Sequence, residues 1–132
     1  VLAKEGLINA LDLRLAAVEG RSDIQASLNA DESIRLPVDL ETALYHIAQE
    51  ALNNSLKHAS AKTITVNLLR NNQQIELQII DDGCGFDPAA AGRAGMGLHN
   101  MLSRAAEIQA ACTIDSQPGS GTRVTVTLEE PA

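Results

Sequence analysis

Three polar side chains between residues 50 and 57 could together handle a metal ion and phosphate. They are Glu50, Asn54 and Lys57, and on a helical wheel of about 100° per residue they form one strip bordering an apolar face. Mg²⁺ is coordinated by oxygen atoms, including those of amides. One or two protein ligands are enough to bind it when phosphate oxygens and water molecules complete its octahedral coordination. Asn54 is therefore a candidate metal ligand, Glu50 a candidate base or orienting group, and Lys57 a candidate phosphate contact. The alternative is a solvated helix edge.

A second candidate, Asp81, ends a stretch in which isoleucine and leucine alternate with polar residues. A period of two places its carboxylate on the apolar side of a strand, where it is costly unless it finds hydrogen-bond donors. The exocyclic amine of a purine is one such donor. The alternative is an ordinary Asp-Gly turn in which the aspartate binds its own backbone. Asp82 is expected to face outward and to be unimportant.

Two glycine pairs follow this aspartate. Gly83 and Gly85 permit positive φ and the close approach of a flat ligand, whereas Gly95 and Gly97 stand where a helix is expected to begin and free amides attract phosphate. Taken singly, each pair also fits a turn, a hinge or a packing contact. Cys84 is interpreted as a filler residue, because no cation or base is recognisably paired with it. A helix of this kind, an aspartate and two glycine pairs should occur in this order by chance far less often than any one of them alone.

Composition excludes several classes of protein. The 132 residues fit one domain, and 45% hydrophobic content is ordinary for a globular protein. Only 2% of the residues are aromatic, so the core is expected to be aliphatic. Clusters of aromatic side chains on which nucleic-acid bases could stack are not expected either. The net charge of −7, without a basic stripe, argues against nucleic acid or an anionic membrane surface as partner. Cys84 and Cys112 are expected to be free thiols and not zinc ligands. The alternative for the two cysteines is a disulfide.

Periodicity predicts the elements that must position these groups. A first helix over residues 2–18 is expected to end at Gly20. It is followed by a strand within 21–30, a helix over 38–59, strands over 62–70 and 74–82, a loop over 83–97, a helix over 97–109, and strands over 111–116 and 123–129. Helices and strands do not alternate strictly. The prediction is therefore an α+β fold, a two-layer sandwich with a mixed sheet of about five strands and three helices on one face.

On the helix over 38–59, the wheel separates a core face from an outer face. His46 and Asn53 fall on the outer face, so Asn54 is preferred over its neighbour as a site residue. The core face is expected to comprise Leu40, Leu44, Ile47, Ala51 and Ser55, widened by Tyr45, Ala48, Leu52 and Leu56.

In this order, the motifs resemble the GHKL ATPase superfamily, whose fold is the Bergerat ATP-binding sandwich, over about residues 38–130. The segment 46–59 resembles the N box, especially that of nitrate/nitrite-sensor-type histidine kinases. The resemblance implies that Asn54 coordinates Mg²⁺ and that Glu50 takes the position of the preceding acidic residue. Lys57 would lie near the phosphates.

Residues 81–86 resemble the first glycine box and residues 95–98 the second, with the 86–94 segment as a lid over the triphosphate. Residues 118–122 are similar to the last motif of the kinases, although alone they also fit a plain hairpin turn. No separate phenylalanine box is present. The resemblance implies that ATP is bound by Asn54, His58, Asp81, Gly83, Gly85, Phe86, Gly95, Met96, Gly97, Leu98 and Thr122.

The helix containing Glu5-Gly6-Leu7 resembles the junction after the dimerisation helices of this kinase subgroup. Residues 1–20 are therefore expected to be the remnant of the helix following the dimerisation and phosphoacceptor domain, and residues 21–132 the ATP-binding catalytic domain. None of His46, His58 and His99 is assigned as the phosphoacceptor. The γ-phosphate of Mg-ATP is expected to go to a histidine on an upstream helix absent from this chain, so the fragment should not phosphorylate itself.

The implied partners are the protein's own dimerisation and phosphoacceptor domain and a response regulator, with no nucleic acid and no direct membrane contact by this domain. A cytoplasmic location is expected, whether or not the full-length protein is anchored. Two alternatives stay open: a serine kinase of the same fold acting on an anti-anti-sigma factor, and a non-catalytic interaction module.

Overall fold

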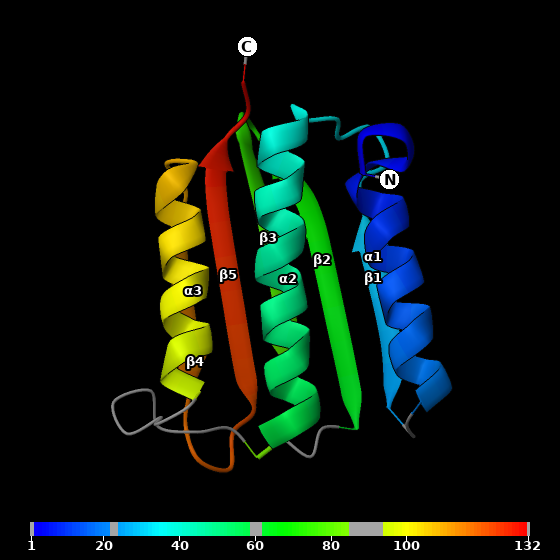
Figure 1. The fold of residues 1–132 in the computed structure, drawn as a ribbon, viewed down its shortest axis with the longest axis vertical. Coiled ribbons are helices and arrows are strands. Elements are labelled where there is room, and N and C mark those ends of the chain that lie inside the picture. Colours follow the sequence, from blue (N-terminus) through cyan, green and yellow to red (C-terminus); the bar gives the residue numbers. More distant parts are fainter. Residues whose placement is uncertain (1, 22–23, 59–61, 85–93, 132) are drawn as a thin grey trace.

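The computed structural model describes residues 2–21, 24–58, 62–84 and 94–131. The described residues form three helices, which lie side by side on one face of a sheet with α2 in the middle (Figure 1). The elements in chain order are α1 (Leu2–Arg21), β1 (Gln25–Ala30), α2 (Val38–His58), β2 (Thr63–Asn71), β3 (Gln74–Asp81), α3 (Ala94–Glu107), β4 (Ala111–Ser116) and β5 (Thr122–Glu129).

The sheet is mixed, with strand order β1-β2-β3-β5-β4. β1 and β2 are parallel, and α2 connects them because parallel neighbours need a long crossover. All other pairs are antiparallel. These features confirm the predicted α+β two-layer architecture.

The core between the helices and the sheet is aliphatic, as the composition predicts. In β3, buried and half-buried residues alternate, because successive side chains point to opposite faces. On α2, Leu44, Ile47, Ala51 and Ser55 are buried as the wheel predicts. Leu56, by contrast, is 41% exposed. Its assignment to the core is therefore wrong.

Two tight reversals have identifiable causes. β2 and β3 form the predicted hairpin, with Asn71 paired to Gln74 and Asn72 at φ 60°, a conformation that asparagine tolerates. α3 ends with Gln109 at φ 57°, where Ala110 N–H donates to Ala105 O and Gln109 N–H to Ala106 O. This pair of bonds is a Schellman motif.

The first helix is interrupted at Gly6, whose φ of 82° and ψ of 168° are not helical. The buried carboxylate of Glu41 accepts hydrogen bonds from Leu7 N–H (3.2 Å) and Leu36 N–H (3.1 Å). It therefore ties the start of the main part of α1 to the segment preceding α2. At the other end of α1, the carboxylate of Glu19 accepts from Ala26 N–H in β1 (3.1 Å).

Two predicted boundaries were wrong. Gly20 lies inside α1, which continues to Arg21. α3 begins at Ala94 rather than at Gly97, so Gly95 and Gly97 lie within its first turns. Among the described residues, no helix is long and apolar enough to cross a membrane.

Candidate functional site

Asp81, the last residue of β3, is buried with 7% exposure, on the apolar side as its alternation predicts. Its carboxylate has two donors. Ser55 Oγ in α2 donates to Oδ2 at 2.5 Å, and Gly83 N–H donates to Oδ1 at 2.9 Å. The bond from Gly83 belongs to the local Asp-Gly turn that the sequence offered as an alternative. The turn is therefore present, and so is the bond from Ser55 in α2. The two bonds fix the carboxylate between a helix and a turn.

The start of β5 lies beside this aspartate. Asp81 and Thr122 are partners in the β3–β5 register, and Thr122 Oγ1 lies 2.9 Å from Ser116 Oγ. A Cβ added to Gly121, whose φ is +75°, would overlap the backbone carbonyl oxygen of Asp81. Only glycine therefore allows this approach of the two strands.

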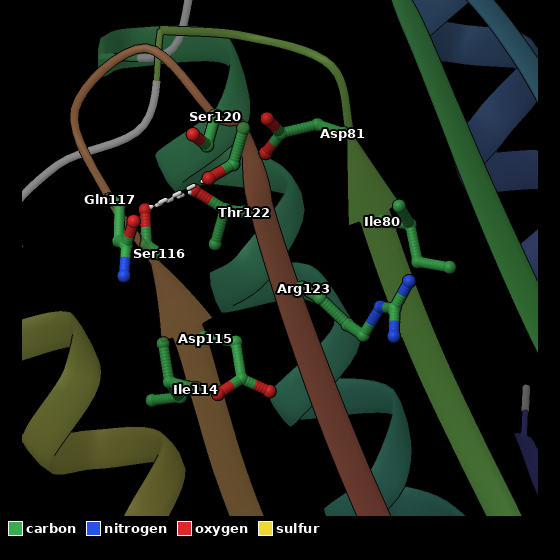
Figure 2. A pocket seen from close by; sticks show the side chains of 10 residues that line it. Ile80, Asp81, Ile114, Asp115, Ser116, Gln117, Ser120, Thr122 and Arg123 are labelled. Atoms are coloured by element: carbon green, nitrogen blue, oxygen red, sulfur yellow. Dashed lines mark hydrogen bonds between the residues drawn. The ribbon is translucent and has the colours of Figure 1, made fainter.

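A hollow of about 450 Å³ opens at this end of the sheet, and Figure 2 shows Asp81 facing its β4 and β5 side. Of the predicted site residues, Asp81 and Thr122 line this hollow, whereas Glu50, Asn54, Gly83 and Gly97 do not. The lining residues are Ile80, Asp81, Ile114, Asp115, Ser116, Gln117, Ser120, Gly121, Thr122 and Arg123.

The other half lies where α3 meets α2. A Cβ built on Gly97 would stand 2.7 Å from Glu50 Oε1 and 3.3 Å from both Oδ1 and Nδ2 of Asn54. The structure thus brings together Glu50, Asn54 and Gly97, one residue of the second glycine pair. Both Glu50 and Asn54 are half-buried.

Asn53, predicted to face outward, instead accepts a hydrogen bond from Arg14 Nη2 of α1 at 3.0 Å. The outer-face assignment is wrong because α1 packs against that flank of α2. The wheel still separates the two asparagines, since only Asn54 lies beside Gly97.

Asp82 does face outward, but it has a clear structural role. Its Oδ1 accepts from Lys62 N–H (2.8 Å) and Thr63 N–H (2.9 Å) at the start of β2. The backbone amide of Thr63, followed by that of Lys62, lowers the pKa of Asp82 below its usual value because these donors stabilise the charged carboxylate. The sequence-based dismissal of Asp82 was therefore wrong.

Some predicted residues lie outside the described part of the chain. This holds for Gly85, for Phe86 and the rest of the predicted 86–94 lid up to residue 93, and for the side chains of Lys57, His58 and Met96. Leu98, in contrast, is buried in the core at 8% exposure.

Sequence reasoning missed Ser55 as a partner of Asp81, although both were assigned to buried faces. The available signal was the serine on the core face of α2, since a buried polar group requires a hydrogen-bond partner. Neither cysteine forms a disulfide, as expected. Burial raises the pKa of the Cys112 thiol, whereas Cys84 is exposed in the turn after β3.

The turn between β4 and β5 is bonded to the segment that follows Asp81. Gly119 N–H donates to Cys84 O at 2.5 Å, and Ser120 N–H donates to Gln117 O within the turn. The 118–122 motif is thereby held against the first glycine motif.

Residues 39–132 match the family described as "Histidine kinase-, DNA gyrase B-, and HSP90-like ATPase". An uncharacterised sensor-like histidine kinase from Chloroflexus aurantiacus is 40% identical over 86% of this chain and 20% of its own length. Sensor histidine kinase MctS from Rhizobium johnstonii is 34% identical over the whole chain and 29% of its own length. The chain thus spans less than a third of the length of these relatives.

Solved structures agree on the fold. Histidine kinase AdeS of Acinetobacter baumannii has a TM-score of 0.76 at 15% identity, over 94% of this chain and 64% of that one. The mycobacterial sensor histidine kinase MprB has a TM-score of 0.69 at 21% identity, over 94% of both chains.

Proposed function

The chain belongs to the family of histidine kinase-, DNA gyrase B- and HSP90-like ATPases and is the ATP-binding catalytic domain of a sensor histidine kinase, and we propose that its site joins an adenine-binding half around Asp81 to a metal- and phosphate-binding half around Asn54. Within a longer protein, it would transfer the γ-phosphate of Mg-ATP to a histidine on another domain.

One observation carries this proposal: α2 contacts both halves within two adjacent residues. Ser55 donates to Asp81, and Asn54 lies against Gly97. Three motifs far apart in the sequence therefore meet at the carboxyl-terminal half of one helix. A chance occurrence of the motifs would not require this convergence.

On the adenine side, Asp81 would accept a hydrogen bond from the exocyclic amine of the base. Its carboxylate has about four acceptor positions, and Ser55 and Gly83 use two of them. Thr122 would border the same base, since it is the register partner of Asp81. Gly83 and Gly85 would leave room for the ring.

On the phosphate side, the donors fit a small hard cation. Asn54 supplies a neutral amide oxygen and Glu50 a carboxylate, both beside Gly97, and oxygen is the ligand atom that Mg²⁺ prefers. Asn54 would hold the metal, with phosphate oxygens and water as further ligands. Bound Mg²⁺ would supply positive charge to the phosphate oxygens.

The remaining groups would position the phosphates rather than react with them, because phosphoryl transfer needs mainly alignment and charge stabilisation. Amides at the start of α3, around Gly95, Met96 and Gly97, would donate to phosphate oxygens, because the first N–H groups of a helix lack partners within it. Lys57 and His58 would add positive charge nearby. Glu50 would orient the accepting group or take up its proton.

For the whole protein, we propose that residues 1–20 continue a helix from the dimerisation and phosphoacceptor domain, and that residues 21–132 form the catalytic domain. The phosphoryl group would pass to a response regulator, and the domain would work in the cytoplasm. We assign the chain to the nitrate/nitrite-sensor-type subgroup on the sequence of residues 46–59.

Calorimetric titration with a non-hydrolysable ATP analogue tests the site directly. Binding should strengthen at least about tenfold with Mg²⁺, as expected for a bridging cation. Asn54→Ala should remove this dependence on Mg²⁺, whereas Asn53→Ala, its neighbour bonded to Arg14, should preserve it. Equal loss in both variants, or no binding by the unmodified chain, would contradict the proposal.

Phosphoryl transfer is tested by adding a separate domain that carries an acceptor histidine, with ATP labelled at the γ-phosphate. The added domain should acquire an acid-labile label, as a phosphohistidine does, and the fragment alone should acquire none. An acid-stable label would instead indicate a serine kinase. Label on the fragment itself would overturn the assignment of the acceptor to another domain.

A further inference from the structure

Ser55 carries a buried hydroxyl on the largely apolar core face of α2, and the residue is 3% exposed. Two acceptors lie within reach of its Oγ: Asp81 Oδ2 at 2.5 Å and Ala51 O at 3.1 Å. A serine has one proton to donate. The shorter contact to a charged oxygen is the stronger of the two, so the proton points at Asp81.

We propose that Ser55 is a positioning residue that orients the Asp81 carboxylate and thereby makes the site selective for adenine over 6-oxopurines. This inference rests on the proposed function, since it concerns how the same site chooses its nucleotide.

Both oxygens of the Asp81 carboxylate accept a hydrogen bond. Gly83 N–H holds Oδ1 from the turn, and Ser55 holds Oδ2 from the helix. Held at both oxygens, the carboxylate cannot rotate freely about its terminal bond. Its remaining lone pairs therefore keep fixed directions in which they can accept a hydrogen bond.

A fixed acceptor discriminates between purines. The 6-amino group of adenine donates a hydrogen bond, whereas the 6-oxo group of inosine or guanine presents a second acceptor to the same carboxylate. A buried polar group left unpaired is costly, and for this reason sites that hydrogen-bond an N–H reject analogues lacking it. Without Ser55, the Asp81 carboxylate could rotate away from the oxo group, which would lower this free-energy cost.

Ser55 also links the two halves of the site. Its neighbour Asn54 faces Gly97, so the residue beside the proposed metal ligand sets the base-recognising carboxylate. A serine that only filled space would be replaceable by alanine without consequence for nucleotide choice. The proposal predicts a consequence.

The test compares Ser55→Ala with the unmodified chain in calorimetric titrations of a non-hydrolysable ATP analogue and the matching inosine analogue. Ser55→Ala should weaken ATP-analogue binding about tenfold, the loss expected for a hydrogen bond to a charged group. Inosine-analogue binding should change less, so the ratio of the two affinities falls. Ser55→Thr, which keeps the hydroxyl, should restore the ratio, and Ser103→Ala, at an exposed serine of α3, should leave it unchanged.

Thermal unfolding of each variant shows whether a change in binding comes from a loss of folding. Ser55→Cys has a side chain of similar size that is a weaker hydrogen-bond donor. It should therefore give a ratio of the two affinities between those of Ser55→Ala and the unmodified chain. A Ser55→Ala ratio equal to that of the unmodified chain would overturn the role of Ser55 while leaving ATP binding intact. Failure of the unmodified chain to bind the ATP analogue would instead overturn the proposed function itself.

Discussion

Gly97 in α3 lies so close to Glu50 in α2 that a single added Cβ would stand 2.7 Å from the carboxylate oxygen Oε1. The backbone of α3 at Gly97 therefore lies directly against the Glu50 side chain of α2. Asn54 borders the same point, at 3.3 Å from the added Cβ.

Gly97→Ala should impair binding while sparing the fold. The carboxylate end of Glu50 is flexible and can move aside, and alanine is favoured over glycine inside a helix by about 1 kcal/mol. Displacement of Glu50 and Asn54 should weaken Mg²⁺-dependent binding of an ATP analogue at least about tenfold. Calorimetry and thermal unfolding measure the two effects separately.

Gly20→Ala is the matched control for that substitution. Gly20 also lies in a helix, α1, but an added Cβ there has nothing within 4 Å. It should stabilise the fold by about 0.5–1 kcal/mol and leave binding unchanged. Unaltered binding by Gly97→Ala would show that the positions of Glu50 and Asn54 are not critical.

Gly121→Ala should be considerably more damaging than Gly119→Ala. Both glycines have positive φ, but an added Cβ at Gly119 meets nothing within 4 Å, whereas at Gly121 it overlaps the backbone of Asp81. The cost at Gly119 should be about 1 kcal/mol, from backbone conformation alone. Gly121→Ala should exceed it by at least about 1–3 kcal/mol, in the range of overpacking. Equal free energies of unfolding in urea would contradict the close approach of β3 and β5.

Glu41→Ala should destabilise the protein by about 2–4 kcal/mol, because it leaves the amides of Leu7 and Leu36 without their acceptor in a buried place. Hydrogen exchange at both amides should accelerate. Asp39→Ala is the control, since Asp39 lies in the same first turn of α2 but is exposed; it should cost no more than about 1 kcal/mol. Unchanged exchange at Leu7 would argue against the tie between α1 and α2.

Asp82 should contribute to the sensitivity of the fold to acid. The pKa of Asp82 in the folded state lies below the usual value of 3.8. The stabilising contribution of Asp82 is therefore complete at pH values above 3.8. It is lost as the pH falls through the lower pKa of the folded state. The difference in free energy of unfolding between the unmodified chain and Asp82→Asn should be constant above about pH 5 and shrink in more acidic solution. Urea unfolding between pH 2 and 7 gives this difference, and parallel curves would refute it.

Local patterns predicted the elements well because each has a clear period. The alternation in β3 placed Asp81 on the buried side, and the wheel on α2 placed Asn54 on the edge that meets α3. The failures came from long-range packing. Asn53 is covered by Arg14 from a helix 39 residues earlier, and Asp82 binds a strand start 19 residues earlier. No window of local sequence contains those partners.

The unexpected bond between Ser55 and Asp81 has the same origin. The two residues are 26 positions apart, and each was assigned separately to a buried face. Pairing them requires knowing how far along β3 the helix α2 reaches, which depends on the packing of the whole core.

The bond from Ala26 N–H to Glu19 bears on how the molecule behaves at high concentration. β1 is an outer strand, and its residues Gln25–Ala30 carry no charge to deter a strand from another molecule. By occupying one outward amide with a carboxylate, Glu19 protects this edge against edge-to-edge association, the usual hazard of an open sheet.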